Sequence, residues 1–473
     1  MSDFRVETDS MGSVEVPAGA YYGAQTQRAV DNFGLSGWRF GRRFISSVGL
    51  IKWAAANINR RLGLLDPSLA DAIAEAADEV VAGLHDQQFP VDVFQTGSGT
   101  STNMNANEVI ANRANQLLGF QLGAKEPVHP NDHVNLCQSS NDVVPTATHL
   151  AGLSALEQDL VPALRQLGAS LDAKAAEFDH VVKSGRTHLM DATPVRLGQE
   201  FSAFGAQIER SIRRVHNSTA HLKELALGGT AVGTGINAHP EFASRAIALM
   251  ADRLDMELIE APNHFEAQSA RDAVVEASGA LKSTAISMAR IANDLRWLAS
   301  GPSCGIGEIL LPELQPGSSI MPGKVNPVIP EAVIQVAAQV IGNDQAIALG
   351  GLGSMFELNT MMPLMAHDLV FSAETLASAA RALAVKCVDG IEADEKRCAQ
   401  LLEHNLSLVT ALAPKIGYDA AAKVAKTAYT TGKSLREVVL EAKLMPEAAL
   451  EEALDVYAMT QGGLGRNEER THD

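Results

Sequence analysis

Apolar residues recur along most of the chain at the three- and four-residue spacing of amphipathic helices, and short polar stretches interrupt them. Asp66 and Pro67 form a capping pair ahead of one such run at 68–74. The spacing predicts that helices make up nearly all of the regular structure, so we expect an all-α fold. The predicted helices cover residues 105–118, 141–183, 198–227, 241–256, 265–298, 331–349 and 362–390.

Several of the predicted helices are apolar on more than one face, which is typical of buried helices. Residues 332–348, for example, contain six valines and isoleucines and few charges. Such helices favour a long central bundle that packs against other subunits. The tail, with turns at Gly417 and Gly432, is predicted to be a small separate helical unit. We therefore expect an N-terminal domain, a central helical-bundle domain and a C-terminal helical domain at 1–138, 139–391 and 392–473.

Composition narrows the class of fold and of partner. Of the 473 residues, 46% are hydrophobic but only 5% are aromatic, which favours an aliphatic, alanine-rich core of closely packed helices over sheet. The formal net charge of −18 argues against nucleic acid or an anionic membrane as a partner. A small anionic substrate would need a local positive site.

Cysteine usage indicates a reducing compartment and no metal site. The four cysteines form no C-x-x-C pair, and no cysteine or histidine cluster has ligand spacing, so we expect no metal, no cofactor and a cytoplasmic protein with reduced thiols. Residues 1–13 are polar and mixed in charge, unlike a signal peptide. No uncharged apolar run approaches membrane-spanning length.

The stretch 317–327 concentrates glycine, proline, serine, lysine and asparagine in one short loop. It leads into the helix predicted from Glu331, with Pro330 in the first turn. Unpaired N–H groups at a helix N-terminus favour an anion, and Lys324 adds a positive charge there. The alternative is a flexible surface loop, but such loops rarely combine rigid proline with glycine, lysine and asparagine so densely.

Three further polar clusters interrupt the helices, at 95–103, 138–142 and 184–188, and we expect each at a helix start or end. Taken alone, a Ser/Thr/Gly run is more often a helix cap, and a lone histidine is more often structural. Together they offer hydroxyl, amide and imidazole groups without metal-ligand spacing. That set suits a small polyanionic substrate and proton-transfer chemistry.

These stretches carry a family resemblance. The Gly-Ser-x-x-Met-x-x-Lys-x-Asn pattern at 317–326 resembles the signature loop of the fumarase/aspartase superfamily. A glycine-rich segment at 229–237 lacks the spacing of a dinucleotide loop and instead resembles a loop of the same superfamily. The segments that resemble class II, iron-independent fumarases are 96–100, 129–132, 139–142 and 185–188.

The resemblance extends from about residue 4 to beyond 432. Aspartases typically have Gln, Ala and Thr where His188, Ser98 and Ser140 stand, so these residues favour a fumarase. Two positions depart from the fumarase pattern, Cys137 in place of Ser and Met190 in place of Gln, and neither belongs to the implied chemistry.

The resemblance implies reversible hydration of fumarate to L-malate, a step of the tricarboxylic acid cycle, through an aci-carboxylate intermediate. Ser318 would be the base and His188, oriented by Glu331, the acid. Lys324 and Asn326 would stabilise the developing negative charge. The implied substrate-binding residues are Ser98, Gly99, Thr100, Ser139, Ser140, Asn141, Thr187, Ser319, Lys324, Val325 and Asn326. The implied secondary anion site comprises His129, Pro130, Asn131 and Asp132.

The implied fold has three domains, and its central long-helix bundle forms a twenty-helix core in a homotetramer whose active sites are shared between chains. The partner would be a small dicarboxylate substrate, with no nucleic acid and no membrane. Two alternatives stay open. One is aspartase or another lyase of the superfamily, and the other is a non-catalytic helical scaffold, which loss of Ser318, His188 or Lys324 would have signalled.

Overall fold

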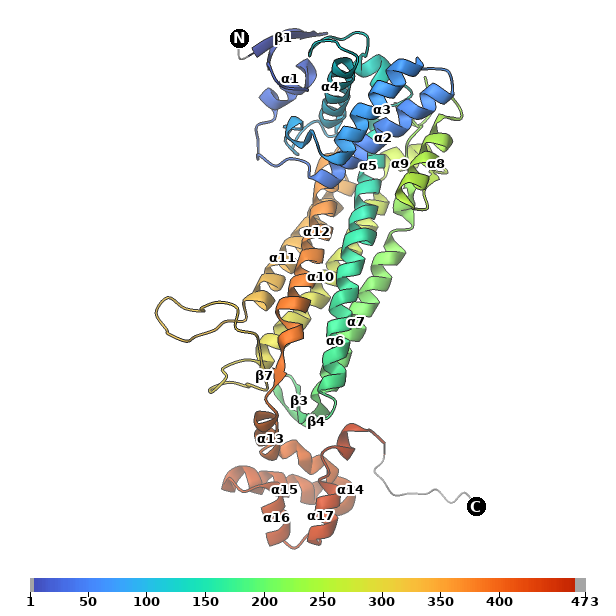
Figure 1. The fold of residues 1–473 in the computed structure, drawn as a ribbon. Helices are drawn as coiled ribbons and strands as arrows, with labels where there is room; N and C mark the ends of the chain where they lie inside the picture. Colours follow the sequence, from blue (N-terminus) through green and yellow to red (C-terminus); the bar gives the residue numbers. More distant parts are fainter. Residues whose placement is uncertain (1–3, 464–473) are drawn as a thin grey trace, which may run out of the picture. The chain divides into compact units, whose positions relative to one another are not determined.

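The computed structural model describes residues 4–463 (Figure 1). The chain separates into two compact units. Unit 1 comprises Met1–Ala163, Ser211–Ile286 and Val336–Ser378. Unit 2 comprises Leu164–Arg210, Ser287–Gln335 and Ala379–Asp473. Strands occur among the described residues only as two-stranded pairs, which confirms the prediction of an all-α fold. The division at residues 139 and 392 stays a prediction.

Unit 1 begins with a β-hairpin and then becomes helical. Asp66 caps the third helix by accepting hydrogen bonds from Ser68 N and Leu69 N, as the capping pair predicted. The second helix packs against the third and the fifth. The first elements are β1 (Phe4–Asp9), β2 (Gly12–Pro17), α1 (Ala24–Asn32), α2 (Arg42–Arg61), α3 (Pro67–Ala82), η1 (Asp86–Gln88) and α4 (Thr100–Leu117).

The rest of unit 1 consists of helices with short strands between them. They are η2 (Pro130–Val134), α5 (Ser140–Ser154), η3 (Ala155–Leu160), η4 (His221–Lys223), β5 (Glu224–Leu225), α8 (Phe242–Leu254), β6 (Ile259–Glu260), α9 (His264–Ser269), β8 (Ser354–Met355) and β9 (Leu358–Asn359).

Five long helices each contribute residues to both units. They are α6 (Val161–Glu177), α7 (Leu197–Ser218), α10 (Asp272–Leu298), α11 (Val328–Gly351) and α12 (Met362–Lys386). Helix α11 starts at Val328, three residues before the predicted start, so Pro330 lies in its first turn, where the missing N–H costs no helical hydrogen bond. No helix in residues 4–463 is long and apolar enough to span a membrane.

Unit 2 contains a β-hairpin and the C-terminal helices. The hairpin corrects one expectation, because the cluster at 184–188 lies on a strand and its turn and not at a helix end. The elements are β3 (Val182–Thr187), β4 (Met190–Arg196), β7 (Ile309–Leu310), η5 (Val388–Gly390), β10 (Glu392–Ala393), α13 (Glu395–Glu403), η6 (Leu406–Ala411), α14 (Ala413–Ile416), α15 (Tyr418–Thr431), α16 (Leu435–Glu441), α17 (Glu447–Ala453) and η7 (Ala458–Thr460).

The C-terminal helices share a hydrophobic core of their own. Buried leucines and valines from η6, α15, α16 and α17 meet there, among them Leu412, Val424, Val439 and Leu450. The turns that the sequence placed at Gly417 and Gly432 are the caps of α15, both with positive φ. A small helical unit at the C-terminal end therefore has the apolar contacts that it needs to hold its helices together.

Candidate active site

The glycines before α4 allow two close backbone approaches within unit 1. A Cβ at Gly97 would lie 1.9 Å from Thr360 O, and Gly97 O accepts a hydrogen bond from Met362 N at 3.1 Å. Gly99 has a φ of +73° and faces Val144, so any side chain there would be both strained and crowded. The loop that precedes α4 is therefore held tightly against α5 and the start of α12.

The hydroxyl groups of this loop surround the start of α4. Ser98 Oγ and Thr100 Oγ1 share a hydrogen bond of 2.7 Å, and Gln95 Oε1 accepts from Thr102 N at 3.0 Å. No side chain caps α4 at Gly99. The helix N-terminus thus keeps donor capacity that an anion can use.

Helix α5 begins beside the start of α4. Asn103 Nδ2, one turn into α4, donates to Ser140 Oγ at 3.0 Å. Ser139 caps α5, and its side chain accepts from Asn141 N at 3.2 Å. The structure therefore brings Thr100 and the Ser139–Asn141 cluster, 40 residues apart in sequence, to adjacent helix N-termini in unit 1.

The side chain of Asp142 fixes the glycine-rich loop against α5. It accepts hydrogen bonds from Ser139 N, Gly228 N and Thr230 N at 2.9, 3.1 and 2.9 Å. Burial raises the pKa of Asp142 to about 6, although these hydrogen bonds act to lower it. Asn141 Nδ2 donates to Ala231 O at 2.8 Å, so this loop positions a predicted substrate-binding residue.

Lys52 is a polar residue of this region that the sequence analysis did not single out. It is fully buried on α2 and donates to Asn135 Oδ1 and Gln138 Oε1 at 3.0 and 2.9 Å. Burial lowers its pKa to about 7, which the charge of Asp142 opposes. The available signal was a single lysine within an apolar helical run, since such a residue needs buried partners.

The predicted secondary anion residues border a cavity of about 190 Å³ in unit 1. His129, Pro130 and Asn131 line it together with Lys125, whereas the side chain of Asp132 is 75% exposed. The Nδ1 atom of His129 accepts from Asn131 N and Asp132 N at 3.3 and 3.2 Å. Nδ1 also lies 3.2 Å from Asp132 Oδ2. In the neutral tautomer that accepts the two N–H bonds, the ring proton is on Nε2, which can then donate to an anion.

A tight hairpin in unit 2 presents His188. The register pairs Thr187 with Met190, and His188 and Leu189 form the two-residue turn with φ values of 58° and 60°. Positive φ at both turn positions matches the twist of the flanking strands but is unfavourable for residues with a Cβ. The imidazole of His188 stands at an exposed tip.

A buried ion cluster anchors this hairpin. Glu308 is fully buried and receives a bidentate pair from Arg186 at 2.8 and 2.9 Å, while Lys183 lies 3.1 Å away. Lys183 also donates to Glu200 Oε1 at 2.8 Å. Asn405 Nδ2 bonds Ser184 Oγ and Ala192 O at 3.0 and 2.7 Å. Sequence reasoning missed this cluster because its members are far apart along the chain.

Glu308→Gln is expected to lower the free energy of unfolding by roughly 3–5 kcal/mol, since it takes the carboxylate partner from Arg186 and leaves the buried Lys183 with Glu200 alone. The matched control is Glu395→Gln, which breaks the exposed His180–Glu395 pair of the same unit and should cost about 1 kcal/mol or less. Urea unfolding followed by far-UV circular dichroism compares them. Equal shifts of the two urea midpoints would contradict a supporting role for the cluster.

The 317–327 loop is closed at its base by hydrogen bonds. Gly317 N donates to Lys324 O at 2.7 Å, and Asn326 Nδ2 donates to Gly317 O at 2.7 Å. A Cβ at Gly317 would lie 2.7 Å from Lys324 O, so only glycine fits this closure. The amide of Asn326 therefore supports the loop, in addition to any contact it makes with substrate.

The hydroxyl group of Ser318 accepts two backbone hydrogen bonds. Ile320 N and Met321 N donate to Ser318 Oγ at 3.2 and 3.0 Å. Hydrogen bonds from N–H groups stabilise the deprotonated form of an oxygen acid more than its protonated form. The loop thus holds Ser318 where negative charge on its oxygen is favoured.

Other predicted residues of unit 2 are exposed or make no mutual contact. Ser319, Lys324 and Val325 are exposed on the loop. Glu331 lies in the first turn of α11, and within the described part of one chain it forms no hydrogen bond or ion pair with His188. The pairing that the resemblance implies for these two residues is therefore not made within a single chain.

The cysteines have no disulfide partners among the described residues. Cys137 is buried, and burial raises the pKa of its thiol, which suits an inert side chain. Cys387 and Cys398 are also buried and have pKa values raised to about 12. In residues 4–463, no group of three or more His, Cys, Asp or Glu side chains could hold a metal ion.

Comparison with known proteins identifies the family of the chain. A family model described as "Lyase" matches residues 12–342, and one described as "Fumarase C C-terminus" matches residues 408–461. The crystal structure of class II fumarase from Schistosoma mansoni has a TM-score of 0.93 at 38% identity and covers 97% of this chain and 99% of its own. A fumarate lyase:delta crystallin from Brucella melitensis has a TM-score of 0.93 at 46% identity, with the same coverage.

Curated relatives match along almost the whole chain. The class II fumarate hydratase of Halobacterium salinarum is 57% identical over 462 residues, which is 98% of this chain and 98% of that protein. The enzyme of the same name from Nitrosomonas europaea is 52% identical and covers 98% of this chain and 100% of its own. These matches decide against the aspartase and scaffold alternatives. The chain belongs to the lyase family and, within it, to the class II fumarate hydratases.

Proposed function

We propose that Ser318 is the base of the fumarate hydratase reaction in this chain. In the dehydrating direction its oxygen takes the C3 proton of malate, and the electron pair moves into the adjacent carboxylate. The observation that carries this proposal is the pair of N–H bonds to Ser318 Oγ, since they favour the anionic oxygen that a base requires. Lys324 stands six residues on, and the loop closure between Gly317 N and Lys324 O supports its position.

His188 acts as the acid in this scheme. It delivers a proton, through a water molecule, to the hydroxyl group that leaves C2, while Glu331 orients its ring. The charge that accumulates on the carboxylate as the C3 proton leaves is stabilised by Lys324, Asn326 and loop N–H groups. General acid or base assistance of this kind is worth roughly a hundred- to ten-thousand-fold in rate.

Hydroxyl and amide groups hold the two substrate carboxylates. The starts of α4 and α5 offer N–H donors and hydroxyls side by side, which suits a carboxylate without a metal. We assign this role to Ser98, Gly99, Thr100, Ser139, Ser140, Asn141, Thr187, Ser319 and Val325. The cavity at His129, Pro130 and Asn131, with Asp132 beside it, is proposed to bind a second anion.

The chain is proposed to work as a homotetramer in which chains share each active site. Helix α11 supports this, because Ile341 and Leu349 are 36% and 66% exposed on a helix that is mostly apolar and has few charges. The absence of a bond between Glu331 and His188 in one chain points the same way, because a neighbouring chain could supply the partner. We propose that the tetramer acts in the cytoplasm, within the tricarboxylic acid cycle.

Purified protein is expected to convert L-malate to fumarate. The ultraviolet absorbance of fumarate measures this conversion. It should release no ammonia from L-aspartate, because His188 stands where aspartases typically have Gln. The imidazole of His188 can protonate a leaving hydroxyl group. Ammonia release from aspartate faster than malate turnover would contradict the assignment of His188.

A further inference from the structure

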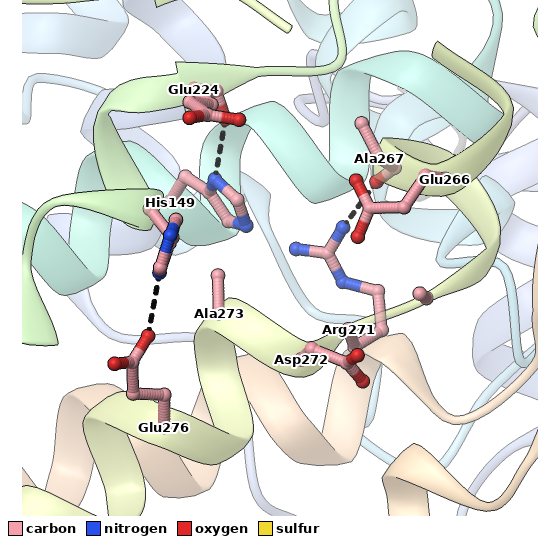
Figure 2. Close-up of a pocket in the computed structure, with 10 residues that line it drawn as sticks. His149, Glu224, Glu266, Ala267, Arg271, Asp272, Ala273 and Glu276 are labelled. Carbon is pink, nitrogen blue, oxygen red and sulfur yellow. Dashed lines mark hydrogen bonds and ion pairs between the residues drawn. The ribbon is translucent and has the colours of Figure 1, made fainter. Parts of the chain in front are cut away.

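A cavity of about 480 Å³ lies in unit 1 and is separate from the residues assigned to catalysis (Figure 2). It is lined from α5, from η4 and β5, from α9 and from the first turns of α10. A volume of this size is in the range of small-molecule sites. None of its lining residues has a role in the reaction described above.

His149 brings an unused hydrogen-bond acceptor to this cavity. The side chain is 5% exposed, and its Nδ1 atom lies 2.8 Å from Glu224 O. A carbonyl oxygen only accepts, so Nδ1 carries the proton and Nε2 has a free lone pair. Burial lowers the pKa of His149 to about 3, which keeps the ring neutral. Within the described residues Nε2 has no partner, and a donor is needed to satisfy it.

Arg271 brings an unused donor to the same cavity. The residue is 2% exposed, and its Nη1 atom donates to Ala267 O at 2.6 Å. Nη2 is buried and has no partner among the described residues. Burial lowers the pKa of the guanidinium to about 10, so it stays charged at neutral pH. Figure 2 shows the guanidinium facing His149 across the cavity. A hydrogen-bond acceptor, preferably a carboxylate, would satisfy the unpaired Nη2 donor of Arg271.

Carboxylates dominate the remaining charge around the cavity. Their net effect is negative, because the described residues that line it include four carboxylates against the guanidinium of Arg271, and the imidazole of His221 is already paired with Glu276 at 2.7 Å. Burial raises the pKa of Glu266, as expected for a carboxylate crowded by others. The four acidic residues are Glu224, Glu266, Asp272 and Glu276.

We propose that this cavity binds a basic amino acid such as lysine. The ligand carboxylate accepts from Arg271 Nη2, and its α-ammonium group donates to His149 Nε2. The side-chain cation lies among the acidic residues, near Asp272 and Glu276. His149 Nε2 thus gains a donor and Arg271 Nη2 gains an acceptor. The net positive charge of the ligand complements the negative charge of the surrounding carboxylates.

Simpler ligands fit this arrangement less well. A dicarboxylate would satisfy Arg271 but would be repelled by the four acidic side chains. A diamine would satisfy those side chains but leave Arg271 without an acceptor. These differences define the probes of the test, which are L-lysine, cadaverine as its analogue without the carboxylate, and L-aspartate.

Isothermal titration calorimetry of the full-length wild-type protein at low salt provides the first test. L-lysine is expected to bind at one site per chain, and both cadaverine and L-aspartate should bind roughly tenfold more weakly or not at all, since each loses a charge-assisted hydrogen bond or gains repulsion. No saturable lysine binding, or aspartate binding as tight as that of lysine, would overturn the proposal.

Arg271→Gln separates the carboxylate contact from the rest of the site. Lysine should bind the variant roughly tenfold more weakly, to about the level of cadaverine, while cadaverine binding should change little. Unchanged lysine binding would overturn the assignment of Arg271. Far-UV circular dichroism checks that the variant folds.

A rim variant keeps the test decisive if Arg271→Gln does not fold. Glu276→Gln removes one acidic side chain that is 46% exposed and should weaken lysine binding roughly twofold to fivefold. Its matched control is Glu257→Gln, which removes an 80% exposed carboxylate outside the cavity and should leave lysine binding unchanged. Equal effects of the two substitutions would mean that lysine responds only to overall charge, and the site would be rejected.

Discussion

Ser318→Ala is expected to lower kcat for malate by roughly a hundred- to ten-thousand-fold while the protein still folds and assembles. Ser318 is only partly buried, and within residues 4–463 its hydroxyl group accepts the N–H bonds from Ile320 and Met321. Its loss therefore removes a chemical group and very little packing. Ser318→Cys should behave similarly, because a larger sulfur in the same loop does not reproduce the position of the oxygen.

The adjacent serine provides the matched control. Ser319 is exposed and has the same side chain, so Ser319→Ala should mainly raise KM for malate and leave kcat within a few-fold of the wild type. Steady-state kinetics of both variants, with thermal midpoints measured alongside, tests the difference. Near-normal turnover of Ser318→Ala would mean that another group accepts the proton.

Two inactive variants, His188→Asn and Ser318→Ala, are expected to restore activity to each other after unfolding and refolding in equal amounts. If different chains supply the histidine and the serine of one site, random assembly leaves both residues intact in about a quarter of sites. Turnover should then return to roughly that fraction of wild type. The physical reason is the proposed sharing of the site: within the described part of one chain His188 and Glu331 form no hydrogen bond or ion pair, so under that proposal a neighbouring chain supplies the partner.

Refolded wild-type protein sets the scale for this experiment, and each variant refolded alone sets the background. Mixing the two native variants without unfolding should give no activity, since their chains then have no opportunity to exchange. A refolded mixture as inactive as its parts, beside a wild-type control that recovers, would show that each site is built within one chain.

Local signals in the sequence were sufficient for most helices. The cap at Asp66 and the apolar run after it predicted α3, and Pro330 placed the start of α11 within three residues. Both predictions depend on interactions between residues that are close in the chain, so the residues that make them stand next to one another in the sequence. The pattern of glycines and hydroxyls likewise located the loop before α4.

The hairpin that carries His188 was not predicted, for a physical reason. Its turn has neither glycine nor asparagine, and its strands are held by Glu308 and Asn405, which lie more than a hundred residues away. Lys52 was missed for the same reason, because its partners Asn135 and Gln138 come from another segment. Tertiary contacts outweigh local preference at such places, and one sequence does not reveal them.

The left-handed backbone at His188 and Leu189 has a consequence for protein engineering. Glycine or asparagine would relax the turn by of the order of 1 kcal/mol, so selection for heat resistance alone would favour replacing the histidine. With His188 as the proposed acid, such a screen would enrich proteins that are more stable but have little turnover. Any design method that scores backbone conformation would suggest the same replacement. His188 occupies a turn position at which a residue with a Cβ lowers stability. Screens for stability therefore need a parallel measurement of turnover.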